Sequence, residues 1–233
     1  MIDILLAGVG GQGTVLAAKV LAQAAQSKGW QVRTAETIGM AQRGGNVTSH
    51  VRMGSNGEAI YSSLITPGTA DMVIALEPGE AARALPYLAP GGVLVTATTA
   101  IHPVTAALAS QPYRAGDVVA ALANSLQAEA SREQAAESIV APNTVTADQD
   151  ASTDGVEGYP VPLFIPVDDE ALVREAGAGS RKSLNMMLLA VAVAQGRVPL
   201  TVDELKDAVR ACVKPQFVAM NLAAIDTAVA NFG

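Results

Sequence analysis

The chain has 233 residues, of which 50% are hydrophobic and 16% are charged. These proportions are typical of one globular domain with a sizeable core. The net charge is −7, and most of the excess lies in residues 127–158, which hold seven acidic side chains against one basic side chain. Since the rest of the chain is nearly neutral and only 3% of the residues are aromatic, we expect no nucleic-acid binding.

The scarcity of cysteine and histidine argues against a metal centre in this chain. Cys212 is the one cysteine, so it cannot form an intramolecular disulfide or hold an iron–sulfur cluster by itself, and we expect a small buried hydrophobe inside a helix. Neither His50 nor His102 has the spacing of a metal ligand. No serine–histidine–aspartate or paired-carboxylate arrangement is legible. We therefore predict a binding subunit without catalytic residues of its own.

The chain carries no signal for a membrane segment. Its longest unbroken apolar run, Met186–Ala194, has nine residues, about half of what a membrane span needs. The sequence begins Met1-Ile2-Asp3 and lacks the basic start of a signal peptide. These features predict a cytoplasmic protein.

Strands and helices alternate along the first hundred residues. Residues 2–9 are almost continuously apolar, which is typical of a strand covered on both faces in a parallel sheet. Asn56-Gly57 predicts a hairpin between strands at 47–53 and 59–65. The other elements predicted in this part are strands at 30–38, 71–76 and 93–98 and helices at 14–27 and 80–88.

The second half combines an acidic insertion with a helical end. Residues 127–158 are too polar to offset the entropy of ordering them, so we predict a mobile insertion with a helical start near 127–138. A strand at 161–167 and helices at 183–194, 202–213 and 217–231 follow. Together the elements predict an α/β fold in one domain, 1–233: a Rossmann-like, mainly parallel sheet flanked by helices, with an antiparallel hairpin excursion and an acidic flexible insertion.

A glycine cluster after the first strand is the first candidate site. Glycines between a strand and a helix let the backbone approach a phosphate, and the helix N-terminus attracts its charge. Two other interpretations stay open. The glycines serve only a tight turn, or they bind a nicotinamide or flavin cofactor with Glu36 as the ribose-binding acid. The ligand-binding residues predicted in this loop are Gly8, Gly10, Gly11, Gln12 and Gly13.

A second candidate site follows the second predicted strand. Open α/β sheets place ligands at the carboxyl ends of strands, and Arg43 beside two glycines offers a bidentate anion donor next to accessible backbone. The alternative is a solvated surface loop. His50 and Arg52 lie two residues apart in the next strand, so they face the same side and could extend the site. The ligand-binding residues predicted here are Gln42, Arg43, Gly44, Gly45 and Asn46.

These motifs resemble the gamma domain of the 2-oxoacid:ferredoxin oxidoreductases. The similarity spans roughly residues 1–100 and 160–225 in one order. Within the family, the Met-Ala-Gln-Arg-Gly-Gly run looks most like the beta subunit of indolepyruvate:ferredoxin oxidoreductase. The resemblance rests on Gly-Val-Gly-Gly-Gln-Gly at 8–13, Met-Ala-Gln-Arg-Gly-Gly at 40–45, Ser-His-Val-Arg at 49–52, Ala-Leu-Glu-Pro at 75–78, Pro-Gly-Gly at 90–92 and Leu-Asn-Met at 184–186.

The resemblance implies a role within a larger enzyme. Members of the family oxidatively decarboxylate a 2-oxoacid to its acyl-CoA and CO₂ and pass the electrons to ferredoxin. Thiamine diphosphate and iron–sulfur clusters are carried by a large partner subunit, whereas the gamma domain is associated with coenzyme A. We therefore expect the first glycine loop to bind a CoA phosphate, the second cluster to bind phosphate or face the partner's thiamine, and the substrate to be an arylpyruvate such as indolepyruvate. The alternatives are an independent NAD(P)- or flavin-dependent oxidoreductase and a non-catalytic scaffold subunit.

Overall fold

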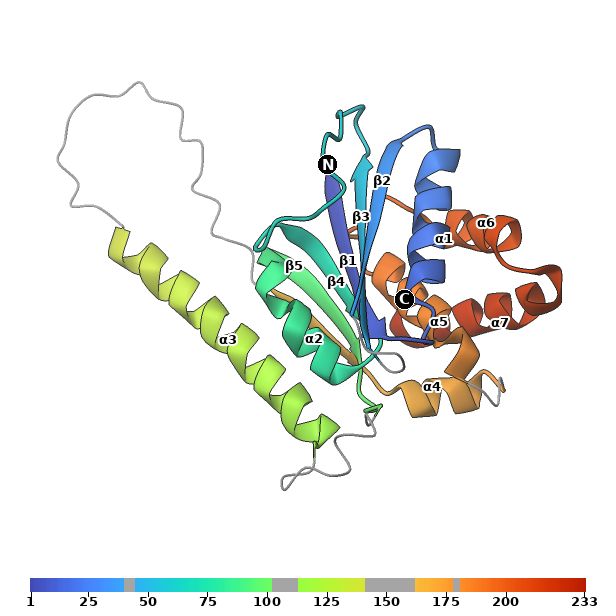
Figure 1. The fold of residues 1–233 in the computed structure, drawn as a ribbon. Helices are drawn as coiled ribbons and strands as arrows, with labels where there is room; N and C mark the ends of the chain where they lie inside the picture. Colours follow the sequence, from blue (N-terminus) through green and yellow to red (C-terminus); the bar gives the residue numbers. More distant parts are fainter. Residues whose placement is uncertain (40–44, 102–112, 141–161, 178–180) are drawn as a thin grey trace.

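A six-stranded sheet forms the centre of the molecule (Figure 1). The computed structural model describes residues 1–39, 45–101, 113–140, 162–177 and 181–233. The strand order is β2-β3-β1-β4-β5-β6. The strands are β1 (Ile2–Val9), β2 (Gln31–Ile38), β3 (Asn46–Gly54), β4 (Ala70–Ala75), β5 (Leu88–Ala97) and β6 (Leu163–Val167).

The sheet is mainly parallel. β1 pairs in parallel with β4, β4 with β5, and β5 with β6. β3 runs antiparallel to both β1 and β2, so β2 points the same way as the other strands. The predicted parallel α/β sheet with one antiparallel excursion is therefore confirmed.

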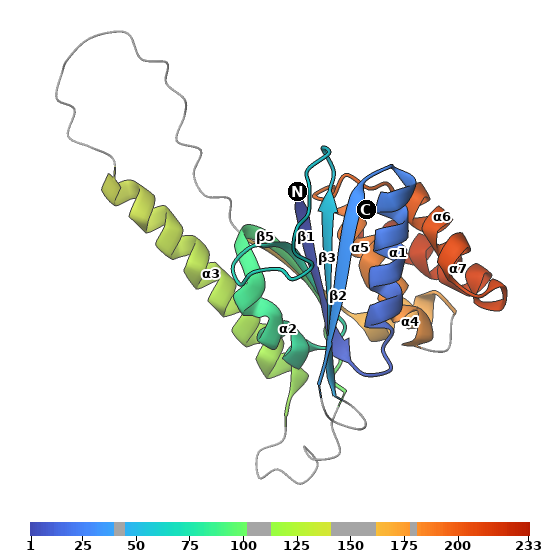
Figure 2. The ribbon, with the colours of Figure 1, turned by 45° about the horizontal axis from the view of Figure 1, so that its top comes forward.

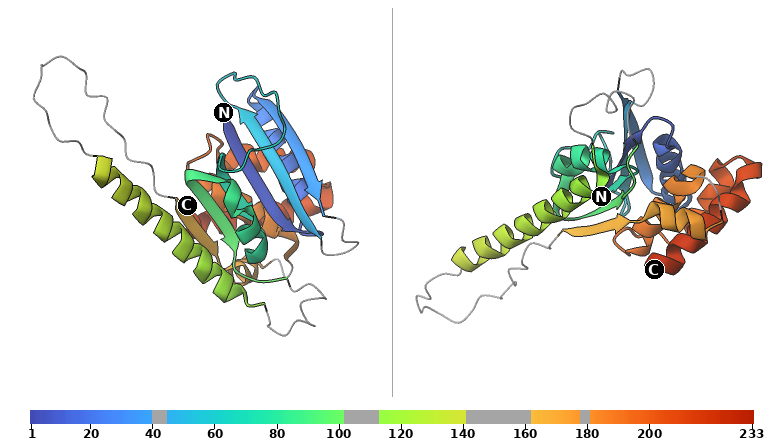
Figure 3. Two further views of the ribbon diagram at one scale, coloured as in Figure 1. Left: turned by 60° about the vertical axis from the view of Figure 1, so that its left-hand side comes forward. Right: turned by 90° about the horizontal axis from the view of Figure 1, so that it is seen from below.

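Helices cover both faces of the sheet, as Figures 2 and 3 show. One face is covered by α1 (Thr14–Ser27), α5 (Leu184–Ala194), α6 (Val202–Cys212) and α7 (Pro215–Phe232), and the other by α2 (Pro78–Ala84) and α3 (Ala115–Val140). The short helix α4 (Asp169–Glu175) follows β6.

The side chains of β1 alternate between two hydrophobic cores. Ile4 and Leu6 pack into the core under α1 and α5, whereas Leu5 and Ala7 pack into the core under α2. This two-sided burial explains the almost continuous apolar run of the strand. The nine-residue apolar run of the sequence lies in α5, and residues 184–193 of this helix are all buried.

The predicted strand at 59–65 is wrong, because this segment crosses the face of β3 without pairing as a strand. The Nδ1 atom of His50 accepts a hydrogen bond from the Ile65 N–H (3.2 Å), and Arg52 donates to the Ser62 carbonyl (3.2 Å). These side chains satisfy backbone groups that a strand ladder would otherwise pair. The antiparallel hairpin is instead β2–β3, joined by residues 39–45.

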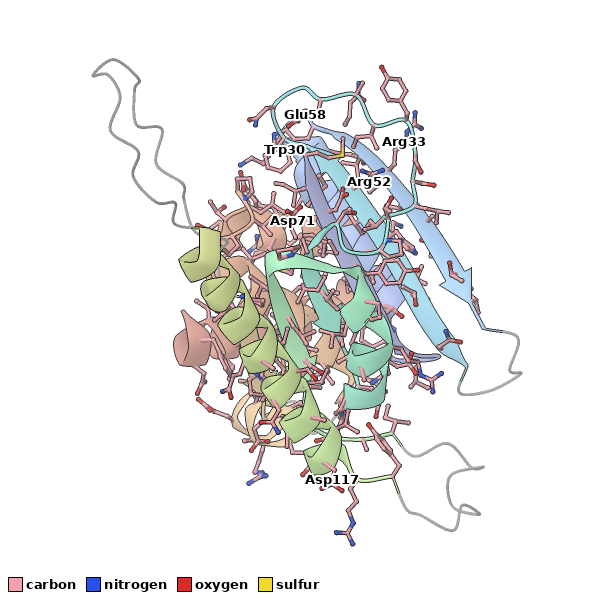
Figure 4. The ribbon with its side chains drawn as sticks, turned by 90° about the vertical axis from the view of Figure 1, so that its left-hand side faces the viewer. Trp30, Arg33, Arg52, Glu58, Asp71 and Asp117 are labelled. Carbon is pink, nitrogen blue, oxygen red and sulfur yellow. The ribbon has the colours of Figure 1, made fainter. Side chains whose placement is uncertain are left out.

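The start of the predicted insertion is helical. The helix α3 continues to Val140, which confirms the helical start expected near 127–138, while residues 141–158 lie outside the described residues. The first half of α3 and all of α4 were not predicted. Figure 4 places Asp117 of α3 at one end of the sheet and Arg52 and Glu58 at the other.

Candidate anion-binding site

A cavity of about 340 Å³ lies at the carboxyl ends of the strands. The loop between β1 and α1 forms one wall, and the residues just before α5 form the opposite wall. Two helices, α1 and α5, therefore begin beside the same cavity, and the first amides of a helix have no intrahelical acceptor. The lining residues are Gly10, Gly11, Gln12, Ile101, Arg181, Lys182 and Leu184.

The glycine loop is fixed in a conformation that favours glycine. Gly11 and Gly13 have φ angles of +96° and +84°, in the left-handed region that other residues rarely enter. A side chain on Gly13 would also collide with Asn185, since its Cβ would lie 2.6 Å from the Asn185 Nδ2 atom. Gly13 therefore sets both the turn and the close approach of α1 to α5.

The side chain of Gln12 connects the carboxyl ends of β1 and β4 through two hydrogen bonds. Its Oε1 atom accepts a hydrogen bond from the Val9 N–H (2.6 Å), and its Nε2 atom donates to the Leu76 carbonyl (2.7 Å). Gly8 leaves room for this arrangement, because a Cβ there would lie 2.9 Å from Gln12 Oε1. With its amide engaged in this way, Gln12 shapes the loop from within and lines the cavity.

The structure brings the two predicted clusters together at one point. The Gly10 N–H donates a hydrogen bond to the Gly45 carbonyl (2.8 Å). Gln42, Arg43 and Gly44 lie outside the described residues. Asn46 opens β3, where its carbonyl accepts from the Gly39 N–H (2.8 Å), and its side chain lines a different cavity.

Two cations that sequence reasoning missed complete the first cavity. Arg181 and Lys182 line it directly before α5. Positive side chains are electrostatically unfavourable at a helix N-terminus unless an anion is close by. A basic pair placed immediately before an apolar helix was therefore the available sequence signal. Together with the glycine loop, the pair makes the cavity suited to an anionic ligand.

A second cavity of about 200 Å³ lies on the opposite face of the sheet, beside α2. His50 and Glu80 line it, and both are buried. Burial lowers the pKa of His50 and raises the pKa of Glu80. As predicted, His50 and Arg52 face the same side, but both hold the segment at 60–65 and neither lines the first cavity.

The position of Glu36 does not suit a ribose-binding acid. Glu36 lies on β2, and β3 separates β2 from β1. Two strand spacings are about 10 Å, so the acid is remote from the glycine loop that follows β1. In a dinucleotide-binding fold the acid-bearing strand lies next to the first strand.

Among the described residues, no group of three or more histidine, cysteine or acidic side chains could hold a metal ion, and no helix is long and apolar enough to cross a membrane. Cys212 is partly buried and packs against the larger core, and burial raises the pKa of its thiol. A raised pKa disfavours the reactive thiolate.

Fold and site together define an open α/β domain with a cavity, lined by the glycine loop, Arg181 and Lys182, at the carboxyl ends of its strands. A family model described as pyruvate ferredoxin/flavodoxin oxidoreductase matches residues 3–231. The chain belongs to this family.

Relatives agree with this assignment, and solved structures share the fold. The chain is 31% identical to indolepyruvate oxidoreductase subunit IorB of Archaeoglobus fulgidus over 96% of this chain and 92% of the relative, and 29% identical to that of Pyrococcus horikoshii over 97% and 94%. The gamma subunit of a keto/oxoacid ferredoxin oxidoreductase from Geobacter sulfurreducens has a similar fold, with a TM-score of 0.59, 19% identity and coverage of 99% and 97%. A 2-oxoglutarate:ferredoxin oxidoreductase from Magnetococcus marinus, with 2-oxoglutarate, coenzyme A and succinyl-CoA bound, matches with a TM-score of 0.60 and 18% identity over 98% of this chain and 30% of its own.

Proposed function

We propose that this chain is the small subunit of a thiamine-dependent 2-oxoacid:ferredoxin oxidoreductase and contributes the part that binds coenzyme A. The observation that carries the proposal is the meeting of two helix N-termini, the glycine loop, Arg181 and Lys182 at one cavity. Coenzyme A carries several phosphate charges. Amides at helix N-termini and cationic side chains are the groups that bind phosphate in proteins.

The cavity is suited to part of the coenzyme. Its volume of about 340 Å³ is at the lower end of ligand pockets. We infer that it holds a phosphate-bearing section, while the thiol end extends toward the large subunit, which would carry thiamine diphosphate and the iron–sulfur clusters. Gly45 adjoins Gly10, and this contact supports a role in the same site for the second glycine cluster. Arg43 of that cluster, which lies outside the described residues, is proposed to bind phosphate or to face the partner's thiamine.

The relatives support an arylpyruvate substrate. Those aligned over almost the whole chain are named as indolepyruvate oxidoreductase subunits. We therefore propose a cytoplasmic complex that converts indolepyruvate or a similar 2-oxoacid, with coenzyme A, to the acyl-CoA and CO₂, with ferredoxin receiving the electrons. The large subunit would supply the reacting centre, so the isolated chain is proposed to be inactive.

Calorimetric titration with coenzyme A tests the proposal, using the full chain alone and its complex with the large subunit. We expect binding in the complex that weakens roughly tenfold in Arg181→Gln, because one charge-assisted contact is lost. Arg210→Gln is the matched control, since Arg210 is half-exposed on α6 and paired with Asp207. NADH serves as the second ligand. Binding of NADH in place of coenzyme A would favour an independent dehydrogenase, and binding of neither would favour a scaffold.

A further inference from the structure

Asp169 is a buried carboxylate that lies behind the wall of the anion pocket. It is the first residue of α4 and has no exposed surface. An unpaired carboxylate in such a place is costly. The partners of Asp169 therefore indicate what the residue does.

The two oxygens of Asp169 hold two different segments. The Oδ1 atom accepts hydrogen bonds from the N–H groups of Thr98 (3.1 Å) and Thr99 (2.9 Å). The Oδ2 atom lies 2.6 Å from Arg181 Nη2. The Oδ2 atom of Asp169 and the Nη2 atom of Arg181 are both buried, and neither has another hydrogen-bond partner in the described part of the chain.

These two segments form two walls of the anion pocket. Thr98 and Thr99 lie three and two residues before Ile101, and Ile101 and Arg181 both line the cavity. We propose that Asp169 is the positioning residue of this site: it fixes the guanidinium of Arg181 and the wall at 98–101 before the ligand arrives. This inference rests on the proposed anion-binding function.

The planar guanidinium group of arginine explains how one contact can position the whole side-chain end. Its five N–H groups share one plane, so a fixed Nη2 orients the remaining donors. A flexible arginine would lose its rotamer freedom on binding, whereas a held one has lost it beforehand. The carboxylate also offsets part of the positive charge beside the α5 N-terminus, where cations are unfavourable.

Asp169→Asn tests this role selectively. The asparagine oxygen can still accept from the two threonine amides, but its NH₂ group would face the donor Nη2 of Arg181 and displace it. Asp168→Asn is the matched control: it removes the same charge one residue away, at an exposed position, and asparagine still caps α4. Coenzyme A is titrated into the full chain and its complex with the large subunit, with melting curves recorded for each variant.

We expect Asp169→Asn to weaken coenzyme A binding roughly tenfold, with Asp168→Asn unchanged. In an Arg181→Gln background, Asp169→Asn should cause no further loss, because it acts through Arg181. An equal loss in that background, or wild-type affinity of Asp169→Asn, overturns the positioning role while the proposed function stands. If the wild-type complex does not bind coenzyme A, the proposed function fails and the inference falls with it.

A measurement on the wild-type chain covers the case in which Asp169→Asn does not fold. Nitrogen-detected NMR of the arginine side chains reports rotation of each guanidinium, with Arg181→Lys providing the assignment. We expect Arg181 to rotate slowly without ligand, in contrast to Arg83, whose side chain is 73% exposed. Fast rotation of Arg181 comparable to that of Arg83 would overturn the inference.

Discussion

The side chain of Asn185 donates a hydrogen bond to the carbonyl of Gly13, which lies 172 residues earlier in the chain (3.1 Å). This bond joins the start of α5 to the start of α1. The two helix N-termini beside the cavity that Arg181 and Lys182 line are therefore held by a direct contact.

Gly13→Ala should destabilise the protein more than Gly11→Ala. Both positions have positive φ, which costs a non-glycine residue about 1 kcal/mol. Only Gly13 would also meet Asn185, whereas nothing lies within 4 Å of a Cβ at Gly11. We expect a loss of about 2–3 kcal/mol for Gly13→Ala against about 1 kcal/mol for Gly11→Ala, measured by urea unfolding. Equal losses would show that the Asn185 contact is unimportant.

Gln12→Leu should lower stability by about 2 kcal/mol, because the Val9 N–H and the Leu76 carbonyl both lose a partner. Gln26→Leu is the control, since Gln26 is exposed on α1, the helix that follows the loop. Thermal unfolding of the two variants makes the comparison. A Gln12→Leu melting temperature matching that of the control would show that these two hydrogen bonds do not stabilise the protein.

His50 should make the protein less stable as the pH falls from about 7 to about 5. Burial lowers its pKa below the ordinary value of 6.5, so in this range the unfolded chain binds the proton more readily than the folded chain. The stability linked to the depressed pKa is complete above pH 6.5 and is lost as the pH falls toward the folded pKa. Urea unfolding of the wild type and His50→Gln at several pH values measures this effect, because groups common to both cancel in the difference. A difference that does not vary with pH would contradict it.

Arg52→Leu should release the segment at 60–65. Arg52 pairs with the buried Asp3 (2.9 Å) and donates to the Ser62 carbonyl, so its removal leaves an unpaired carboxylate and costs about 3 kcal/mol. Hydrogen exchange at the Ile65 amide should accelerate. Arg33→Leu is the control, since Arg33 is exposed and stands opposite Arg52 in the neighbouring strand (Figure 4). Equal exchange rates in both variants would argue against anchoring by Arg52.

The sequence alone determined the strand β1, the glycine loop after it and the buried helix α5. The apolar run of β1 and the glycines after it have signatures within about a dozen residues, because burial on two faces and left-handed turns restrict composition locally. The buried helix α5 and the helical start near 127–138 were likewise readable from composition. The family resemblance was carried by these same short runs.

Only the tertiary structure decided how the segments meet. The insertion of β3 between β1 and β2 moved Glu36 away from the glycine loop, and side chains of β3 bound the segment at 60–65 in place of a strand partner. Arg181 and Lys182 line the pocket from a distant part of the chain, and Asp169 pairs with Arg181 behind its wall. Strand order and such contacts depend on pairing between remote segments, which local periodicity does not encode.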